Sequence, residues 1–477
     1  MNLTTKLGYG VGQAADGIKT SAFTTFMFFY YNQVLGLSGS LAGAAALLAL
    51  LVDAVTDPMV GQYSDRFRSR WGRRHPFMIA GSIPFCFAMV ALFSPPAGLS
   101  EMQLFGWMLG GAILVRLMLT LFFVPHLSLG AEMVRDYHER TKLVGYRVFF
   151  SYAGIVATSV LGFAVFFPAT EQYPNGMLDP NSYTGFGVFT GVTATCAMLI
   201  AIFTTWKLIP GLAAPDENQN GRNAMLAFVT VFLTLKQHAF RVLFSVSLAF
   251  MVLSGVTQTL IIYVASYIFE FKPEHMALLA ASVLVGIFLA PWLAQGISRR
   301  FDKKMALAIC VTMGSTVAAL PFILYFLDLF QPLSIVQRLT MVFVGNGISQ
   351  GFMIAYVIVI DSMLSDTVDE HELNTGRREE GLFFAARSLA TKASFGLGSF
   401  LAGVALDIIQ FPQGANPDNV PQAAIDKLAL LSGPISIVLF VATILISSRY
   451  PLNALRHRQI LKEIEAKKVG SAKELRQ

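Results

Sequence analysis

The chain has 477 residues, of which 55% are hydrophobic and only 13% are charged. Soluble domains carry about a quarter of charged residues, so this composition excludes an ordinary soluble protein and indicates an integral membrane protein. The net charge of +6 would suggest a nucleic-acid partner in a soluble protein. Here, Lys and Arg in loops on one side of a lipid bilayer explain that charge, and we expect no nucleic-acid partner.

Apolar segments of spanning length recur along the whole chain, because a transmembrane helix needs about 20 residues. Their approximate limits are 8–36, 41–63, 77–97, 102–126, 147–168, 185–208, 241–269, 276–297, 305–328, 334–360, 383–411 and 427–449. The sequence therefore predicts an all-α integral membrane fold of twelve transmembrane helices. The first segment is too long for the hydrophobic core of a cleavable signal peptide.

Basic residues alternate between the loops. The loop after the second span, SDRFRSRWGRR (64–74), is dense in Arg, and the loops after every further even-numbered span up to the tenth also carry Lys or Arg. The loops 168–184 and 412–426 carry none. By the positive-inside rule the basic side is cytoplasmic. We therefore expect a multi-pass protein of the inner membrane with both termini in the cytoplasm.

The chain also divides into two parts with similar loops. SDRFRSRWGRRHP follows the second span, and SRRFDKK follows the eighth, at the same place in a six-span unit. The predicted organisation is an N-terminal six-helix bundle (1–210), a cytoplasmic linker (211–240), a C-terminal six-helix bundle (241–449) and a basic tail (450–477). Two pseudo-symmetric halves are the plan of many secondary transporters. Chance similarity of two basic loops is the alternative.

Motifs of catalysis are missing from the sequence. It contains no G-x-x-x-x-G-K-[ST] phosphate-binding loop, no H-E-x-x-H and no paired Cys/His spacing. We therefore expect a transporter without a cofactor rather than an enzyme. Its partners are then a small-molecule solute, a coupling cation (H⁺ or Na⁺) and the bilayer, and we expect it to be a monomer.

Two carboxylates lie inside the second span. Asp53 is near its middle, and Asp57 follows at i+4, so both lie on one face of a helix about one turn apart. A charge at bilayer depth costs at least ~2.5–3.5 kcal/mol, so the pair needs a cation, a proton or a basic partner. Oxygen ligands suit a small hard cation, and Pro58 frees the carbonyl of Ala54. The alternative is that each Asp pairs with a basic residue on a neighbouring helix and only holds the bundle together.

Several basic residues also lie within or beside predicted spans. Lys392, in the eleventh span, is the natural counter-charge to the membrane carboxylates. Arg147 opens the fifth span and could bind solute hydroxyls, or its side chain could extend to the interface. Arg116 lies deeper, in the fourth span, and needs a partner. Asp16 in the first span is a candidate solute ligand or a local partner of Lys19.

A charged segment, DSMLSDTVDEHELNTGRREEG (361–381), follows the tenth span. It is either a solvated loop or part of a cytoplasmic gate that pairs with the 64–74 loop. Exposed ion pairs are worth only ~0–1 kcal/mol, which suits contacts that break during opening. The predicted gating residues are Asp65, Arg66, Asp366, Asp369, Arg377 and Arg378.

The chain resembles the glycoside–pentoside–hexuronide:cation symporters of the major facilitator superfamily, whose best-known member is the melibiose permease. The resemblance runs almost end to end. Its residues include TTKLGYGVGQ, VDAVTDPMVGQYSDRFRSRWGRRHPFM, VPHLSLGAEMVRDYHERTKLVGYRVFF and DSMLSDTVDEHELNTGRREEGLFFAARSLATKASFGLG. The resemblance implies a central cavity and alternating access. It also implies that Asp53, Asp57 and Thr120 bind the cation and that Arg147 and Lys392 line the solute cavity.

The chain departs from the family pattern at solute and cation positions. Phe123 stands where an acidic residue binds both sugar and cation, Leu127 replaces a stacking aromatic, Gly17 stands beside Asp16 at a sugar-binding carboxylate, and His126 replaces Tyr. Losing an acidic ligand favours H⁺ over Na⁺.

Three functions stay open from these residues. The first is cation-coupled symport of a sugar, glycoside or uronide. The second is transport of a lysolipid-like or other amphiphilic solute on the same fold, and the third is a non-transporting membrane sensor. Tyr30 and Tyr356 are candidates to stack on a sugar, and packing within the bundle is their alternative role.

Overall fold

The computed structural model describes residues 2–134, 136–211, 235, 237–377, 379–415 and 419–474. The regular secondary structure of these residues is helical. Among them, ten spans are long and apolar enough to cross a membrane. They are formed by α3 (Gly39–Arg66), α4 (His75–Leu92), α5 (Glu101–Met133), α6 (Tyr137–Leu161), α7 (Pro180–Thr205), α9 (His238–Tyr263), α10 (Pro273–Ala281) with α11 (Val283–Arg300), α12 (Lys303–Phe326), α13 (Ile335–Thr375) and α14 (Glu380–Ile408).

The first and last predicted spans are built from shorter pieces. The first consists of α1 (Leu3–Val11), α2 (Ala14–Ser21) and two π-helical segments, η1 (Ala22–Met27) and η2 (Tyr30–Val34). The last consists of α15 (Gln422–Ser432) and α16 (Pro434–Ser447), which meet at Gly433 and Pro434. Proline lacks an N–H and glycine is flexible, so a break is expected there. With these two the predicted twelve spans are complete, and the all-helical membrane fold is confirmed.

Corresponding elements of the two halves have similar ends. The fourth span, α5, begins with a capping box of Ser100 and Gln103, and the tenth, α13, begins with one of Ser334 and Gln337. The first span ends in the π-helical η2, and the seventh ends in the π-helical η6 (Val264–Ile268). α5 packs on α3 and α4, as α13 packs on α11 and α12. These parallels fit two six-helix pseudo-symmetric halves.

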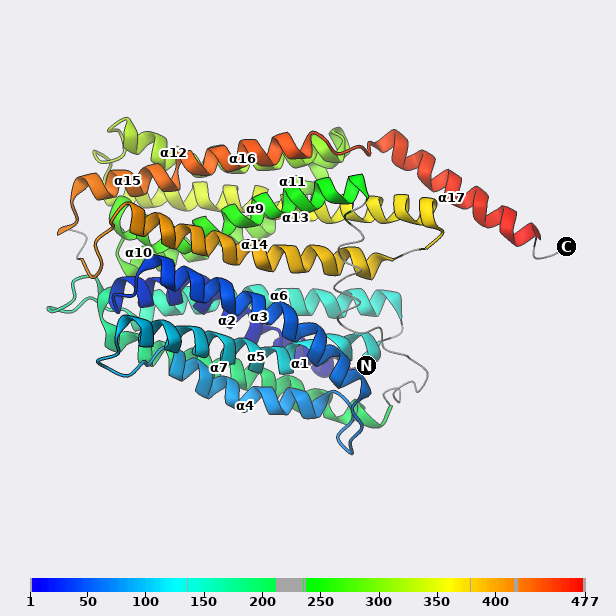
Figure 1. The fold of residues 1–477 in the computed structure, drawn as a ribbon, viewed down its shortest axis with the longest axis horizontal. Helices are drawn as coiled ribbons and strands as arrows, with labels where there is room; N and C mark the ends of the chain where they lie inside the picture. The colour runs from blue at the N-terminus through cyan, green and yellow to red at the C-terminus, as the bar shows by residue number, and fades with distance from the viewer. Residues whose placement is uncertain are drawn as a thin grey trace. The chain divides into compact units, whose positions relative to one another are not determined.

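By packing, the chain forms two compact units. Unit 1 comprises residues 1–224, 255–281 and 395–429, and unit 2 comprises 225–254, 282–394 and 430–477. In unit 1, α4 lies side by side with α5 and α7 (Figure 1). These units follow packing, whereas the predicted bundles follow chain order, so the bundle boundaries stay a prediction. The predicted linker (211–240) lies mostly outside the described residues.

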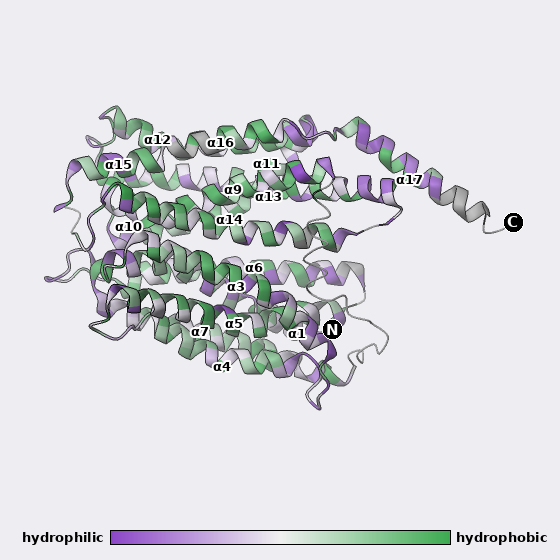
Figure 2. Ribbon diagram, in the orientation of Figure 1, coloured by the Kyte–Doolittle hydropathy of each residue, from purple (hydrophilic) through white to green (hydrophobic). Residues whose placement is uncertain are grey.

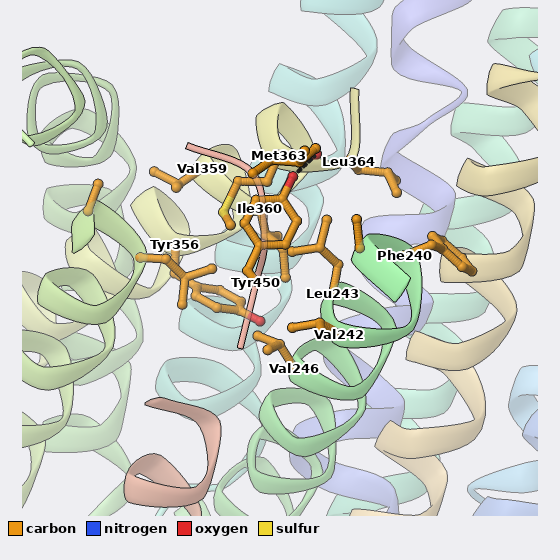
Figure 3. Packing of buried hydrophobic residues seen from close by; sticks show 14 of the residues in the cluster. Phe240, Val242, Leu243, Val246, Tyr356, Val359, Ile360, Met363, Leu364 and Tyr450 are labelled. Atoms are coloured by element: carbon orange, nitrogen blue, oxygen red, sulfur yellow. Dashed lines mark hydrogen bonds between the residues drawn. The ribbon is translucent and has the colours of Figure 1, made fainter. Parts of the chain in front are cut away.

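The core of unit 2 is a cluster of buried side chains, and Figure 3 shows the part of it that comes from α9, α13 and the segment after α16. Tyr356 is 1% exposed there, and its ring stacks on Phe250 at 4.0 Å between centroids. Tyr450 donates from its hydroxyl to the Met363 carbonyl at 3.0 Å, and burial raises the pKa of that hydroxyl. Hydrophobic residues follow the spans along their length, whereas α17 (Ala454–Glu474), in the predicted basic tail, is mostly hydrophilic (Figure 2).

Candidate cation and solute site

The three residues predicted to bind the cation lie together in unit 1. α3 presents Asp53 and Asp57 one turn apart, and α5, which packs on α3, presents Thr120 between them. The Thr120 hydroxyl oxygen lies 2.8 Å from Asp57 Oδ1 and 3.1 Å from Asp53 Oδ1. Asp53 and Thr120 are buried, and Asp57 is partly buried. The side chains therefore form a cluster of oxygen atoms at the depth of a membrane span.

The hydroxyl of Thr120 approaches more acceptors than it can serve. A hydroxyl has one hydrogen to donate, so it can bond to only one of the two carboxylates at a time. The other carboxylate then faces the hydroxyl oxygen at close range and gains from a proton or a cation placed between them. Because all the ligands are oxygen atoms, the cluster can hold a proton or a small hard cation such as Na⁺.

Arg116, on α5, is a basic residue of unit 1 whose side chain contacts this cluster. Its Nη1 lies 3.4 Å from Asp53 Oδ2, and both side chains are 11% exposed. The guanidinium also lies over the ring of Phe23, 5.1 Å from its centroid. The sequence predicts that Arg116 needs a partner, but it does not indicate which carboxylate or ring supplies it.

The predicted solute ligands near the first span have close partners. Asp16 Oδ1 lies 3.2 Å from Lys19 Nζ, so the local pair is present in the structure. Arg147 lies on α6, which packs on α1, the helix that carries Tyr9. Tyr9 in turn stacks on His126 at 4.3 Å, and its carbonyl bonds to His126 Nε2 at 2.9 Å. The solute-binding roles of Asp16 and Arg147 stay predictions.

Two predicted aromatic ligands are buried by packing. Tyr30 is 2% exposed and stacks on Tyr183 at 4.1 Å, and its hydroxyl donates to the Phe93 carbonyl at 3.5 Å. Tyr356 lies in the core of unit 2, as described above. This packing favours the structural role that the sequence left open for both. Lys392 lies on α14 within unit 2, and its role as a counter-charge stays a prediction.

Three of the predicted gating residues, Asp65, Asp366 and Asp369, have partners within their own units. In unit 1, Arg74 Nη2 lies 2.5 Å from Asp65 and 2.8 Å from Glu132, which also pairs with Arg73 at 2.8 Å. Arg66 is exposed. Glu132, at the end of the fourth span, is missed by the sequence analysis, although an acidic residue beside an Arg-rich loop is a usable signal.

In unit 2, Asp366 and Asp369 contact the start of α12 and the C-terminal helix α17. Asp366 lies 2.7 Å from Lys303, and His457 on α17 lies 3.5 Å from Asp366 and 3.0 Å from Asp369. The sequence analysis does not identify His457. Arg377 is exposed, and Arg378 lies outside the described residues. Pairing between the two clusters of charge stays a prediction.

Another polar cluster lies at the N-terminal end of α3, opposite to the end that carries Asp65, and we call it the distal seal. Asp407, on α14, accepts hydrogen bonds from the N–H groups of Gly39 at 2.8 Å and Ser40 at 2.7 Å. Tyr263 donates to Asn32 at 2.5 Å, and Tyr267 to Gln33 at 3.2 Å. All these residues belong to unit 1, and the seal joins segments of the first and second halves of the sequence. Its only sequence signal is one acidic residue near the end of an apolar span.

Within the described residues, ten long spans and two built from shorter helices, with a buried carboxylate–hydroxyl cluster between α3 and α5, are typical of a multi-pass membrane transporter. Comparison with known proteins gives the same class. The chain belongs to the MFS/sugar transport protein family, whose model matches residues 8–454. The sequence prediction of a major facilitator transporter is therefore confirmed.

Two of three relatives of this chain are named for a solute, and the two solutes differ. The inner membrane symporter YicJ of Escherichia coli is 24% identical over 94% of this chain and 92% of its own length. The isoprimeverose transporter of Lactiplantibacillus pentosus is 23% identical over 84% and 79%. The sodium-dependent lysophosphatidylcholine symporter 1 of Gallus gallus is 24% identical over 98% and 89%.

A solved structure shows the same fold. A bacterial homologue of the human lysosomal transporter Spinster superposes with a TM-score of 0.66, covering 97% of each chain at 14% identity. The fold of this chain is thus shared with that bacterial transporter homologue.

Proposed function

We propose that the protein couples the transport of a sugar, glycoside or uronide to a cation by alternating access, with the cation at Asp53, Asp57 and Thr120. The observation that carries this proposal is the convergence of two membrane carboxylates on one hydroxyl. Family membership supports it, since the family is described as sugar transport proteins and relatives are named as symporters. It also argues against a non-transporting sensor.

The coupling follows from the cost of charge in the membrane. An uncompensated carboxylate at this depth costs at least ~2.5–3.5 kcal/mol. A transporter whose site lacks the cation therefore resists passing through the occluded state, in which water is excluded from the site. A proton or cation at the site removes that cost. Solute then binds beside Asp16, Arg147 and Lys392, and the two halves rock to expose it to the other side. We also propose that both termini lie in the cytoplasm, because most Lys and Arg of the loops follow even-numbered spans. We propose a monomer as the working unit.

H⁺ is the cation that the site favours. Phe123 supplies no oxygen to the cluster, and a proton needs one carboxylate where Na⁺ needs several ligands. Na⁺ remains the alternative within the same proposal, and the experiment below separates the two.

A second solute class has one observation in its favour. A relative covering 98% of the chain is named for lysophosphatidylcholine. In this chain apolar Phe123 stands at the position of the acidic ligand, and aliphatic Leu127 stands at that of the stacking aromatic. An amphiphilic solute is therefore the second candidate.

The test is solute-driven ion movement in proteoliposomes, with glycosides, uronides and lysolipids offered in turn under a proton or a sodium gradient. Asp53→Asn is compared with the wild type and with Glu171→Gln, an exposed loop acid that serves as the matched control. We expect accumulation in the wild type and control, and only downhill flux in Asp53→Asn. Unchanged accumulation in Asp53→Asn would remove the cation-site assignment.

A further inference from the structure

We propose that Arg116 is a tethered cation: its guanidinium permanently supplies positive charge at the Asp53 end of the site, so that the exchangeable cation binds at the Asp57–Thr120 end. This inference rests on the proposed cation coupling and assigns a role to a residue outside the predicted ligand set.

The helical register of α3 and α5 places these four residues in two layers. Asp53 and Asp57 are four residues apart on α3, and Arg116 and Thr120 are four residues apart on α5, so each pair occupies one face of its helix. Arg116 contacts Asp53 at 3.4 Å in one layer. Thr120 contacts Asp57 at 2.8 Å in the other, and it is slightly farther from Asp53, at 3.1 Å.

Both oxygens of Asp53 have partners within unit 1. Oδ2 faces the Arg116 guanidinium, and Oδ1 faces the Thr120 hydroxyl. An ion that used Asp53 as a full ligand would have to displace one of these groups. Asp57 meets Thr120 through Oδ1 and is more exposed than Asp53, so it is the carboxylate that an incoming ion reaches first.

Arginine differs from a transported ion and from lysine in chemistry. Its guanidinium stays protonated at any physiological pH, so it cannot leave or lose its charge during the cycle. The Phe23 ring beneath it adds a cation–π contact that holds it near Asp53 without neutralising it. The 3.4 Å ion pair is longer than the 2.7–2.9 Å of a tight charge-assisted bond, so the guanidinium neutralises Asp53 from a loosely held position.

The consequence is a lower affinity for sodium. The fixed positive charge of Arg116 weakens the attraction that the two carboxylates exert on any further cation. At the separations and effective dielectric constants of partly buried sites, one charge changes the affinity on the order of 10- to 100-fold. Removing the Arg116 charge should therefore convert the site into a tighter Na⁺ site.

The test measures the binding of Na⁺ to the purified full-length protein in the absence of solute. The readout is the Na⁺ concentration that gives half of the maximal rise in melting temperature, and choline chloride is the ionic-strength control. We expect Arg116→Gln to bind Na⁺ 10-fold or more tightly than the wild type. Arg116→Lys, which keeps the charge, should stay near the wild type, and Arg116→Gln with Asp53→Asn should return to it, since both charges are then removed together.

Several results would overturn the proposal. An unchanged or weaker Na⁺ affinity in folded Arg116→Gln would do so, and so would a tighter affinity that persists in the double variant. A change of solute preference with no change in Na⁺ affinity would assign Arg116 to the solute instead. Should Arg116→Gln fail to fold, the proposal rests on Asp53→Asn alone, which should lower Na⁺ affinity below the wild type, and on the double variant, which should recover it.

The failure of this inference is distinguishable from failure of the proposed function. The Na⁺ titration needs no solute and no gradient, whereas the symport assay measures solute-driven ion movement in the wild type, Asp53→Asn and Glu171→Gln, none of which alters Arg116. A wild type that accumulates solute while Arg116→Gln gains no Na⁺ affinity would leave the symporter intact and remove only the tether.

Discussion

Asp407 is the residue whose substitution should shift the transport cycle most directly. Its carboxylate accepts the first two free N–H groups of α3, from Gly39 and Ser40, at 2.8 and 2.7 Å. The N-cap residue Ser38 makes no side-chain capping bond, so this end of α3 depends on a carboxylate from α14. Asp407→Asn keeps the shape of the side chain but removes the charge and one of the two acceptor oxygens.

The magnitude follows from the contacts. A hydrogen bond to a charged group contributes about 1.5–3 kcal/mol. A negative charge at a helix N-terminus contributes a further ~0.3–1 kcal/mol. Allowing for the overlap of these effects and the acceptor that Asn retains, we expect about 2–3 kcal/mol, which is roughly a 30- to 150-fold shift away from the sealed state.

The assay is alkylation of a cysteine that the distal seal covers. Ala42 on α3 is 0% exposed, so a cysteine there should react slowly with a membrane-impermeant maleimide in the wild-type background. The native cysteines Cys86, Cys196 and Cys310 are first replaced by serine or alanine. Asp407→Asn should raise the alkylation rate at least 10-fold, while Glu171→Gln should leave it unchanged. An unaltered rate in Asp407→Asn would show that the two hydrogen bonds do not hold the seal closed.

Two further substitutions test neighbouring parts of the argument. Gly403→Ala should open the same seal, because a Cβ there would lie 1.9 Å from the Gly39 carbonyl oxygen. The measurement is the same maleimide assay, and Gly110→Ala is the control because a Cβ at Gly110 meets no atom within 4 Å. Thr120→Val should lower cation-dependent accumulation at least 10-fold in proteoliposomes, while Thr120→Ser keeps the hydroxyl and should retain most of it; equal loss in both would show that the hydroxyl is not the group that matters.

Much of the fold follows from hydrophobic length and loop charge alone. Twelve apolar segments predict twelve spans because a bilayer tolerates little else across its core. The break in the first span and the one at Gly433–Pro434 were not predicted, since a hydrophobic run shows its length but not where its hydrogen-bond register changes. The π-helical segments η1 and η2 are such changes of hydrogen-bond register, so hydrophobic length does not reveal them.

Part of the candidate site could be predicted because the cost of charge in a membrane makes some of its residues conspicuous in the sequence. Asp53 and Asp57 stand out because a charge in an apolar span is rare, and Thr120 enters only through the family resemblance. The pairing of Arg116 with Asp53 depends on the relative rotation and height of α3 and α5, which side-chain packing determines. Asp407 depends on contact across 368 residues of sequence, so no local pattern could assign it to the start of α3.

The shared hydrogen of Thr120 gives the proposed tether a way to respond to the cation. When a proton or an ion occupies Asp57, the Thr120 hydroxyl no longer needs to donate to Asp57 at 2.8 Å, and its hydrogen is available to Asp53 at 3.1 Å. A carboxylate that gains a donor on Oδ1 holds less negative charge for the guanidinium at Oδ2. Arg116 is then held more weakly by Asp53, although its own charge is unchanged. One hydroxyl between two carboxylates thus makes the strength of the Arg116–Asp53 pair depend on whether Asp57 is occupied, which links cation binding to the packing of α5 on α3.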